Sequence, residues 1–193
     1  MTTSAPLDLA PSVAELSRVL AAVRDDQLAG PTPCAGTSVA AMLDHVHGLA
    51  VGLRLAALKR PTGAPSASAA ALPADWRTRV PRELDELAVA WADPAAWEGT
   101  SEPGGVSLPA AWAGRVALNE VVVHGWDLAA ATGRPYAPDP VAVQACIDYA
   151  HEFAAAMPEA EIYGPEVPVA ADAPAMHRLL GLTGRDPGWT PPA

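Results

Sequence analysis

The chain has 193 residues, a length that suits one domain with a single hydrophobic core. Hydrophobic residues make up 50% of it and aromatic residues only 5%, so the apolar mass is mostly Ala, Val and Leu, which favours close-packed helices over a β-sandwich. The formal net charge of -10 comes with no basic patch, which argues against nucleic acid as a partner.

The N-terminal residues and the number of cysteines indicate where in the cell the protein is expected. The first ten residues, MTTSAPLDLA, hold neither a basic segment nor an apolar core, so we expect no signal peptide. No run approaches the roughly 20 apolar residues of a membrane span, so we expect no membrane partner. Two cysteines, Cys34 and Cys146, are too few for a disulfide framework. We therefore predict a cytoplasmic protein.

Two helices are predicted in the first third of the chain. Apolar residues recur at helical spacing over residues 11–27, which predicts the first helix. The Pro/Gly-rich loop 29–36 must end that helix. Thr37 or Ser38 then caps a second helix, which is expected to end near residue 60.

The second helix contains two histidines, His45 and His47. Because they are two residues apart, they point to different faces of the helix. Both faces are apolar, so spacing alone does not say which histidine turns inward. Either one, taken singly, is as well explained as a histidine hydrogen-bonded in or near the core.

The middle of the chain alternates between connections and one more helix. Residues 61–72, PTGAPSASAAAL, are expected to form a flexible, exposed connection. A third helix is predicted over about 73–92, and Pro81 either kinks it or marks its start. The segment 93–108 is rich in Pro and Gly and predicts a turn or a small hairpin.

The fourth helix carries the main candidate site. Residues 115–133, RVALNEVVVHGWDLAAATG, are interpreted as part of one buried helix that starts around Pro109 and ends at Gly133. Glu120 and His124 lie one turn apart, with Cβ atoms about 6 Å from each other, close enough to bind one metal ion. Asp127 extends the same face. Ionisable groups in an apolar stripe need a partner, and the segment leaves a metal ion and a structural polar network both open.

The last third predicts a fifth helix and a tail. Asp139 is the expected N-cap of a helix over residues 140–157. The tail 158–193 holds one short helical piece at about 173–182, and its apolar residues suggest that it packs over the bundle. We therefore predict an all-α fold in a single domain, 1–193, with a bundle over about residues 8–157.

Three segments of the chain resemble one family. They are PTPCAGTSVAAMLDHVHG at 31–48, GRVALNEVVVHGWDLAAATGRP at 114–135, and the run at 167–187. Together they resemble the DinB-like metal-binding four-helix proteins, in the branch that includes the N-terminal domain of mycothiol-dependent maleylpyruvate isomerase. The resemblance covers most of the chain and implies a DinB-like four-helix bundle.

The resemblance also implies a set of metal ligands. The family takes one histidine from its second helix and two ligands, one turn apart, from a later helix. The matching residues here are His45, Glu120 and His124, which selects His45 over His47. One glutamate and two histidines with open positions are typical of a catalytic zinc site. We expect Zn²⁺ first and Ni²⁺ as an alternative, and no catalytic residue beyond the ligands.

The chemistry expected of the protein follows from the same resemblance. Active members of the family resemble thiol transferases and isomerases in which the metal activates a low-molecular-weight thiol. The Ala- and Pro-rich composition resembles that of actinobacterial proteins, so mycothiol is the expected cosubstrate and an electrophilic small molecule the substrate. The alternatives are a metal-binding protein that uses metal-bound water or has a divergent, non-catalytic role, and a structural bundle without metal.

Five other residues have less specific predicted roles. Asp127 and Asn119 are expected to hydrogen-bond the metal ligands. Arg115 either recognises an acidic substrate or lies at the bundle surface. Cys34 is interpreted as a structural thiol, and His177 reaches the site only if the tail folds across it. Bundles of this kind often pair, so a homodimer stays open.

Overall fold

The structure is a computed structural model that describes residues 6–60, 63, 67–156 and 163–192. Parts of four predictions fall outside these residues: the N-terminal five residues, part of the 61–72 connection, residue 157 at the predicted end of the fifth helix, and residues 158–162 and 193 of the tail.

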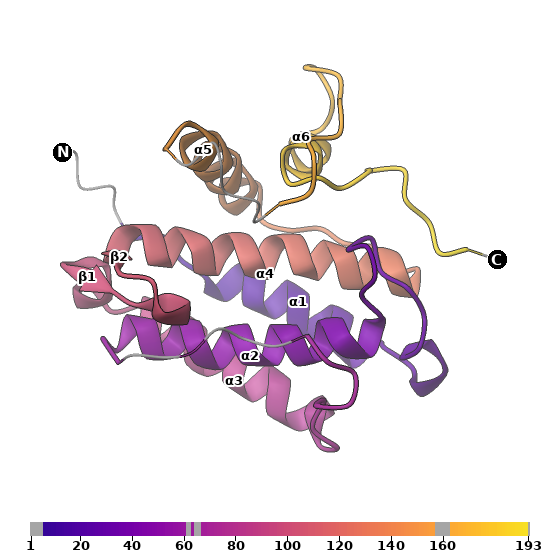
Figure 1. Ribbon diagram of the computed structural model, residues 1–193, viewed down its shortest axis with the longest axis horizontal. Helices are drawn as coiled ribbons and strands as arrows, with labels where there is room; N and C mark the ends of the chain where they lie inside the picture. The colour runs from indigo at the N-terminus through magenta and orange to yellow at the C-terminus, as the bar shows by residue number, and fades with distance from the viewer. Residues whose placement is uncertain (1–5, 61–62, 64–66, 157–162, 193) are drawn as a thin grey trace.

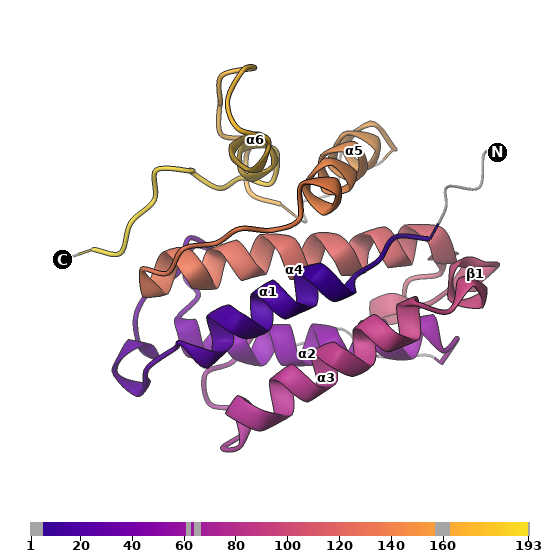
Figure 2. The same cartoon turned by 180° about the vertical axis from the view of Figure 1, so that it is seen from behind.

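Six α-helices form most of the described chain: α1 (Ala10–Ala21), α2 (Val39–Ala57), α3 (Trp76–Trp91), α4 (Ala110–Thr132), α5 (Pro140–Ala156) and α6 (Ala175–Leu182). Helices α1 to α4 pack against one another as a bundle, and α1 contacts both α3 and α4 (Figure 2). Helix α5 lies on the outer side of α4, with α6 beside it (Figure 1). The predicted all-α bundle, with the C-terminal segment packed on it, is confirmed.

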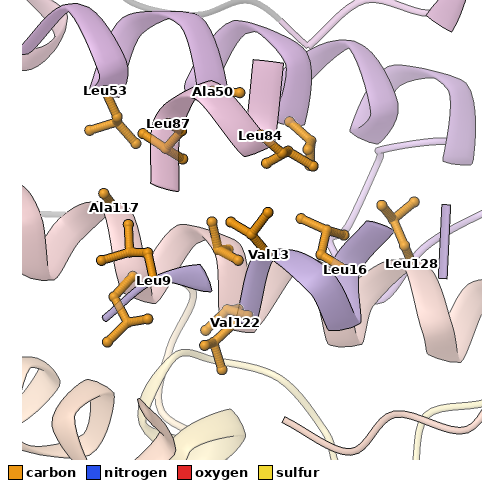
Figure 3. Close-up of a cluster of buried hydrophobic side chains, with 14 of the residues drawn as sticks. Leu9, Val13, Leu16, Ala50, Leu53, Leu84, Leu87, Ala117, Val122 and Leu128 are labelled. Atoms are coloured by element: carbon orange, nitrogen blue, oxygen red, sulfur yellow. The ribbon is translucent and has the colours of Figure 1, made fainter. Parts of the chain in front are cut away.

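The core is built from small and medium apolar side chains between the four bundle helices (Figure 3). The buried residues include Leu9, Val13, Leu16, Ala50, Leu53, Leu84, Leu87, Ala117, Val122 and Leu128. Two tryptophans are also buried in the core. Trp91 Nε1 donates to the carbonyl of Leu53 at 3.1 Å, and Trp97 Nε1 donates to the carbonyl of Trp91 at 2.8 Å. Their polar edges are thus satisfied inside the core.

Helix α2 starts where the sequence predicts and ends slightly earlier. Ser38 accepts a hydrogen bond from the amide of Ala41 at 3.2 Å, so Ser38 is the N-cap. The helix ends at Ala57 because Lys59 turns left-handed, with φ 57°. Arg60 then donates its amide to a carbonyl of the last helical turn, as in a Schellman motif.

Helix α2 is also the one described helix long and apolar enough, by length and composition alone, to cross a membrane, with a mean hydropathy of 1.2. The protein itself buries 56% of it, as expected for the core helix of a bundle. Its length and composition are therefore weak evidence for a span, and the absence of a membrane partner stays a prediction.

Two other boundaries differ from the sequence predictions. The first helix ends at Ala21, and residues 25–27 form a separate 3-10 turn, because Arg24 is extended (φ -96°, ψ 156°) and breaks the helix. Its amide donates to Gln27 Oε1 at 3.0 Å, which fixes that break. Pro81 lies inside α3, which already begins at Trp76, so the alternative in which the helix starts at Pro81 is wrong.

The segment before α4 forms the predicted small hairpin. Strands β1 (Thr100–Ser101) and β2 (Leu108–Pro109) pair antiparallel across a 3-10 turn at Pro103–Gly105. Helix α4 follows directly and ends with Gly133 in the left-handed conformation, φ 66°. Both features agree with the sequence analysis.

The turn after α6 provides a stability prediction. Gly184 has φ +75°, and a Cβ built on it would lie 2.7 Å from the backbone of Gly164. We expect Gly184→Ala to lower the free energy of unfolding by about 2 kcal/mol or more, since backbone strain adds to the steric clash. Chemical denaturation of the purified protein measures this loss.

Gly36 offers the matched control, because its φ is +74° but nothing lies within 4 Å of an added Cβ. Gly36→Ala therefore reports the conformational penalty alone, about 1 kcal/mol. Equal losses in the two variants would mean that the Gly164 contact is not a close-packed one.

Candidate metal centre

Three side chains from two helices meet at one point in the bundle. His45 comes from α2, and Glu120 and His124 come from α4. One nitrogen or oxygen atom of each lies within 4.8 Å of the others. The rings of His45 and His124 meet edge to face, with centroids 5.0 Å apart and planes at 83°. The α2–α4 contact thus unites residues about 75 positions apart in the sequence.

His124 is held from both ring nitrogens. Its Nε2 lies 2.9 Å from Glu120 Oε2, and its Nδ1 lies 2.9 Å from Asp127 Oδ2. Burial by itself lowers the pKa of His124, but the hydrogen bonds to Asp127 and Glu120 outweigh burial and raise the pKa to about 10. Without a metal, His124 is therefore an imidazolium that donates to both carboxylates at neutral pH.

Both carboxylates are ionised at neutral pH. Burial opposes ionisation of Glu120, yet the hydrogen bond with His124 and the nearby positive charges hold its pKa below the ordinary value. Burial also opposes ionisation of Asp127, whose pKa is lowered by His124 and by Arg185. Arg185 Nη2 lies 3.1 Å from Asp127 Oδ2. The buried charges are thus paired, as burial requires.

The donor set fits a divalent metal ion. Two imidazole nitrogens and one carboxylate oxygen make the ligand set of catalytic zinc sites, in which ligand atoms lie about 3.4 Å apart. Solvent reaches one of the three ligands, since 24% of the Glu120 side chain is exposed. Asp127 occupies the Nδ1 side of His124 and directs Nε2 toward the other two ligands, as carboxylate–histidine–metal triads do.

The other predicted site residues take different positions. His47 is half-buried and is not part of the three-residue cluster found among the described residues. Asn119 is turned toward the C-terminal segment, where its Oδ1 accepts a hydrogen bond from the Tyr163 hydroxyl at 2.7 Å. Arg115 forms an ion pair with Glu152 at 2.5 Å, with 16% of the Arg115 side chain exposed, and both alternatives for Arg115 stay predictions.

Two further residues were named from the sequence. His177 is exposed on α6, and Cys34 is half-buried with a free thiol. The C-terminal segment does reach the site, but through Arg185 and not through His177.

Sequence reasoning missed Arg185. It lies 58 positions from Asp127, and no periodicity links the two. The one available signal is its place in the C-terminal run 167–187 that carries part of the family resemblance. A buried arginine shortly after a short helix has no signature in hydrophobic spacing.

The fold and the site define a class: a helical-bundle protein with a candidate centre of two histidines and one glutamate. Residues 9–129 match the family described as the mycothiol maleylpyruvate isomerase N-terminal domain. The chain belongs to this family, as the sequence resemblance predicted.

Two curated relatives and two solved structures are also similar to the chain. The chain is 35% identical over 133 residues to uncharacterised proteins from two strains of Mycobacterium tuberculosis, an alignment that covers 63% of this chain and 64% of theirs. The fold is similar to crystal structures of mycothiol-dependent maleylpyruvate isomerase and of a histidine-to-alanine mutant of it, with TM-scores of 0.55 and 0.57. Both share 18% identity, over 74% of this chain and 66% of theirs, which establishes the fold alone.

Proposed function

We propose that this protein is a divalent-metal-dependent enzyme that activates a low-molecular-weight thiol, mycothiol, for S-transfer to, or isomerisation of, an electrophilic small molecule. The observation that carries the proposal is the convergence of His45, Glu120 and His124 within 4.8 Å. Membership of the mycothiol maleylpyruvate isomerase N-terminal domain family supports the thiol. The proposal includes a cytoplasmic location, where such thiols are kept reduced.

Each residue of the site has a defined task in this proposal. His45, Glu120 and His124 would hold the ion, which when bound supplies a positive charge that favours a thiolate near neutral pH. Asp127 accepts the Nδ1–H of His124 and keeps Nε2 directed at the ion.

Apolar side chains limit the water around these ligands. Val46 and Leu49 of α2 and Val121 of α4 line a small apolar cavity that borders Glu120. An apolar border strengthens the electrostatic interactions of the charged groups beside it. It also favours a thiol over water as the additional ligand, since sulfur is the less strongly hydrated of the two.

A second candidate function is a structural network that binds no metal. The observation in its favour is that His124 already has a carboxylate partner at each ring nitrogen, both at 2.9 Å. A metal-binding protein that activates water instead of a thiol is the remaining alternative, and it would use the same three ligands.

The test is metal stoichiometry by mass spectrometry on protein purified without a histidine tag, followed by calorimetric titration with mycothiol. We expect about one zinc ion per chain and mycothiol binding only in the zinc-loaded protein. S-methylated mycothiol, which lacks a free thiol, is the matched control ligand and should bind much more weakly. Metal without thiol affinity would favour the water-activating alternative, and absence of bound metal would favour the structural network.

A further inference from the structure

Asp127 is the most deeply placed charge of the site. It has no exposed surface, and its partners come from two separate parts of the chain. His124 of the same helix meets its Oδ2 at 2.9 Å. Arg185, from the segment after α6, meets both oxygens, with Nη2 3.1 Å from Oδ2 and Nε 3.4 Å from Oδ1. The guanidinium thus approaches the carboxylate side-on, the geometry that best fixes its plane.

Arg185 is itself held in place by the turn that ends α6. Its Nη1 donates to the carbonyl of Thr183 at 2.6 Å, and its amide donates to the carbonyl of Leu180 at 2.8 Å. Gly184, in the left-handed conformation, lets the chain reverse between these contacts. The guanidinium is therefore a rigid part of the C-terminal segment, which packs against α5.

We infer that Arg185 is a positioning residue of the candidate metal centre, which it orders through Asp127; the inference rests on the proposed metal site. If His124 held a metal ion, its imidazole would be neutral and would give Asp127 a single Nδ1–H hydrogen bond. Among the residues that the structure describes, Arg185 would then be the cationic side chain in contact with this fully buried carboxylate. If Arg185 were absent, Asp127 would have to leave the position that orients His124, because an unpaired buried charge is costly.

The experiment compares zinc dissociation constants, by competition with a chromophoric chelator, in full-length variants. We expect Arg185→Met to weaken zinc binding about tenfold, as loss of an outer hydrogen-bond partner typically does. Arg185→Lys keeps the charge with fewer donors and should recover part of that loss. Arg134→Met is the matched control, because Arg134 also binds a distant carbonyl, that of Ala22 at 3.2 Å, but away from the site.

A double-mutant cycle tests the route through Asp127. In an Asp127→Asn background, Arg185→Met should cause no further loss, because the residue it positions is already neutral. A second readout is the Nδ1–H of His124 in ¹⁵N NMR spectra of the zinc-loaded protein, whose exchange with water should quicken in Arg185→Met. If Arg185→Met does not fold, the double-mutant cycle with Asp127→Asn is measured with Arg185→Lys instead.

Several results would overturn the inference. An unchanged zinc dissociation constant in Arg185→Met would do so, as would an equal loss in the Asp127→Asn background. Failure of the wild-type protein to bind zinc would overturn the proposed function together with this inference. Zinc binding by the wild type with no Arg185 effect would overturn the inference alone.

Discussion

Replacing His45 with alanine is expected to weaken zinc binding at least a hundredfold, while replacing His47 changes it little. Structural zinc sites with four protein ligands bind their ion with about 10–16 kcal/mol, so one ligand accounts for roughly 3 kcal/mol, or about a hundredfold. His45 brings a ring nitrogen within 4.8 Å of the ligand atoms of Glu120 and His124. Equilibrium titration with a competing chelator measures both variants.

His47 is the natural control for this prediction. It lies in the same helix, α2, and is also half-buried, but it points to a different face. Thermal unfolding of both metal-free variants checks that the bundle is intact. Equal loss of zinc affinity in His45→Ala and His47→Ala would contradict the proposed ligand set.

The sequence predicted the fold largely through local signals. Ser38 caps α2 and Gly133 ends α4, as their side-chain chemistry and backbone freedom predict. The first helix was predicted too long, because the helical spacing of the apolar residues says nothing about the extended conformation of Arg24. A cap is visible in the sequence through its residue type, whereas the extended conformation of one residue in a charged stretch is not.

Contacts within one helix of the site could also be predicted from the sequence, whereas contacts between distant segments could not. The contacts of His124 with Glu120 and Asp127 follow from i, i+4 and i, i+3 spacing on one helix. The choice of His45 over His47 depends on how α2 faces α4, and only the family resemblance supplied it. The contact of Arg185 with Asp127 depends on the path of the C-terminal segment. The orientation of Asn119 depends on the same segment, because Asn119 accepts a hydrogen bond from Tyr163 there. The periodicity of apolar residues within one helix predicts neither the packing of α2 on α4 nor the path of the C-terminal segment.

Zinc affinity is expected to rise about tenfold per pH unit between pH 7 and pH 9. In the metal-free protein the pKa of His124 is raised to about 10, because the hydrogen bonds to Asp127 and Glu120 outweigh burial. For His124 to hold a metal ion, its imidazolium would have to lose one proton, so below this pKa each unit of pH changes the competing proton concentration tenfold. Chelator competition across this range measures the slope, and calorimetry in two buffers should give about one proton released per ion.

The same raised pKa fixes the pH dependence of the metal-free protein. A raised folded-state pKa means that the stabilisation from protonated His124 is complete below the unfolded value of 6.5 and is lost as pH rises toward about 10. Zinc loading removes that proton, so the zinc-loaded protein should not show this loss of stability above neutral pH. A zinc affinity that stays constant from pH 7 to pH 9 would mean that His124 is already neutral without metal, and that its two carboxylate contacts do not hold a proton.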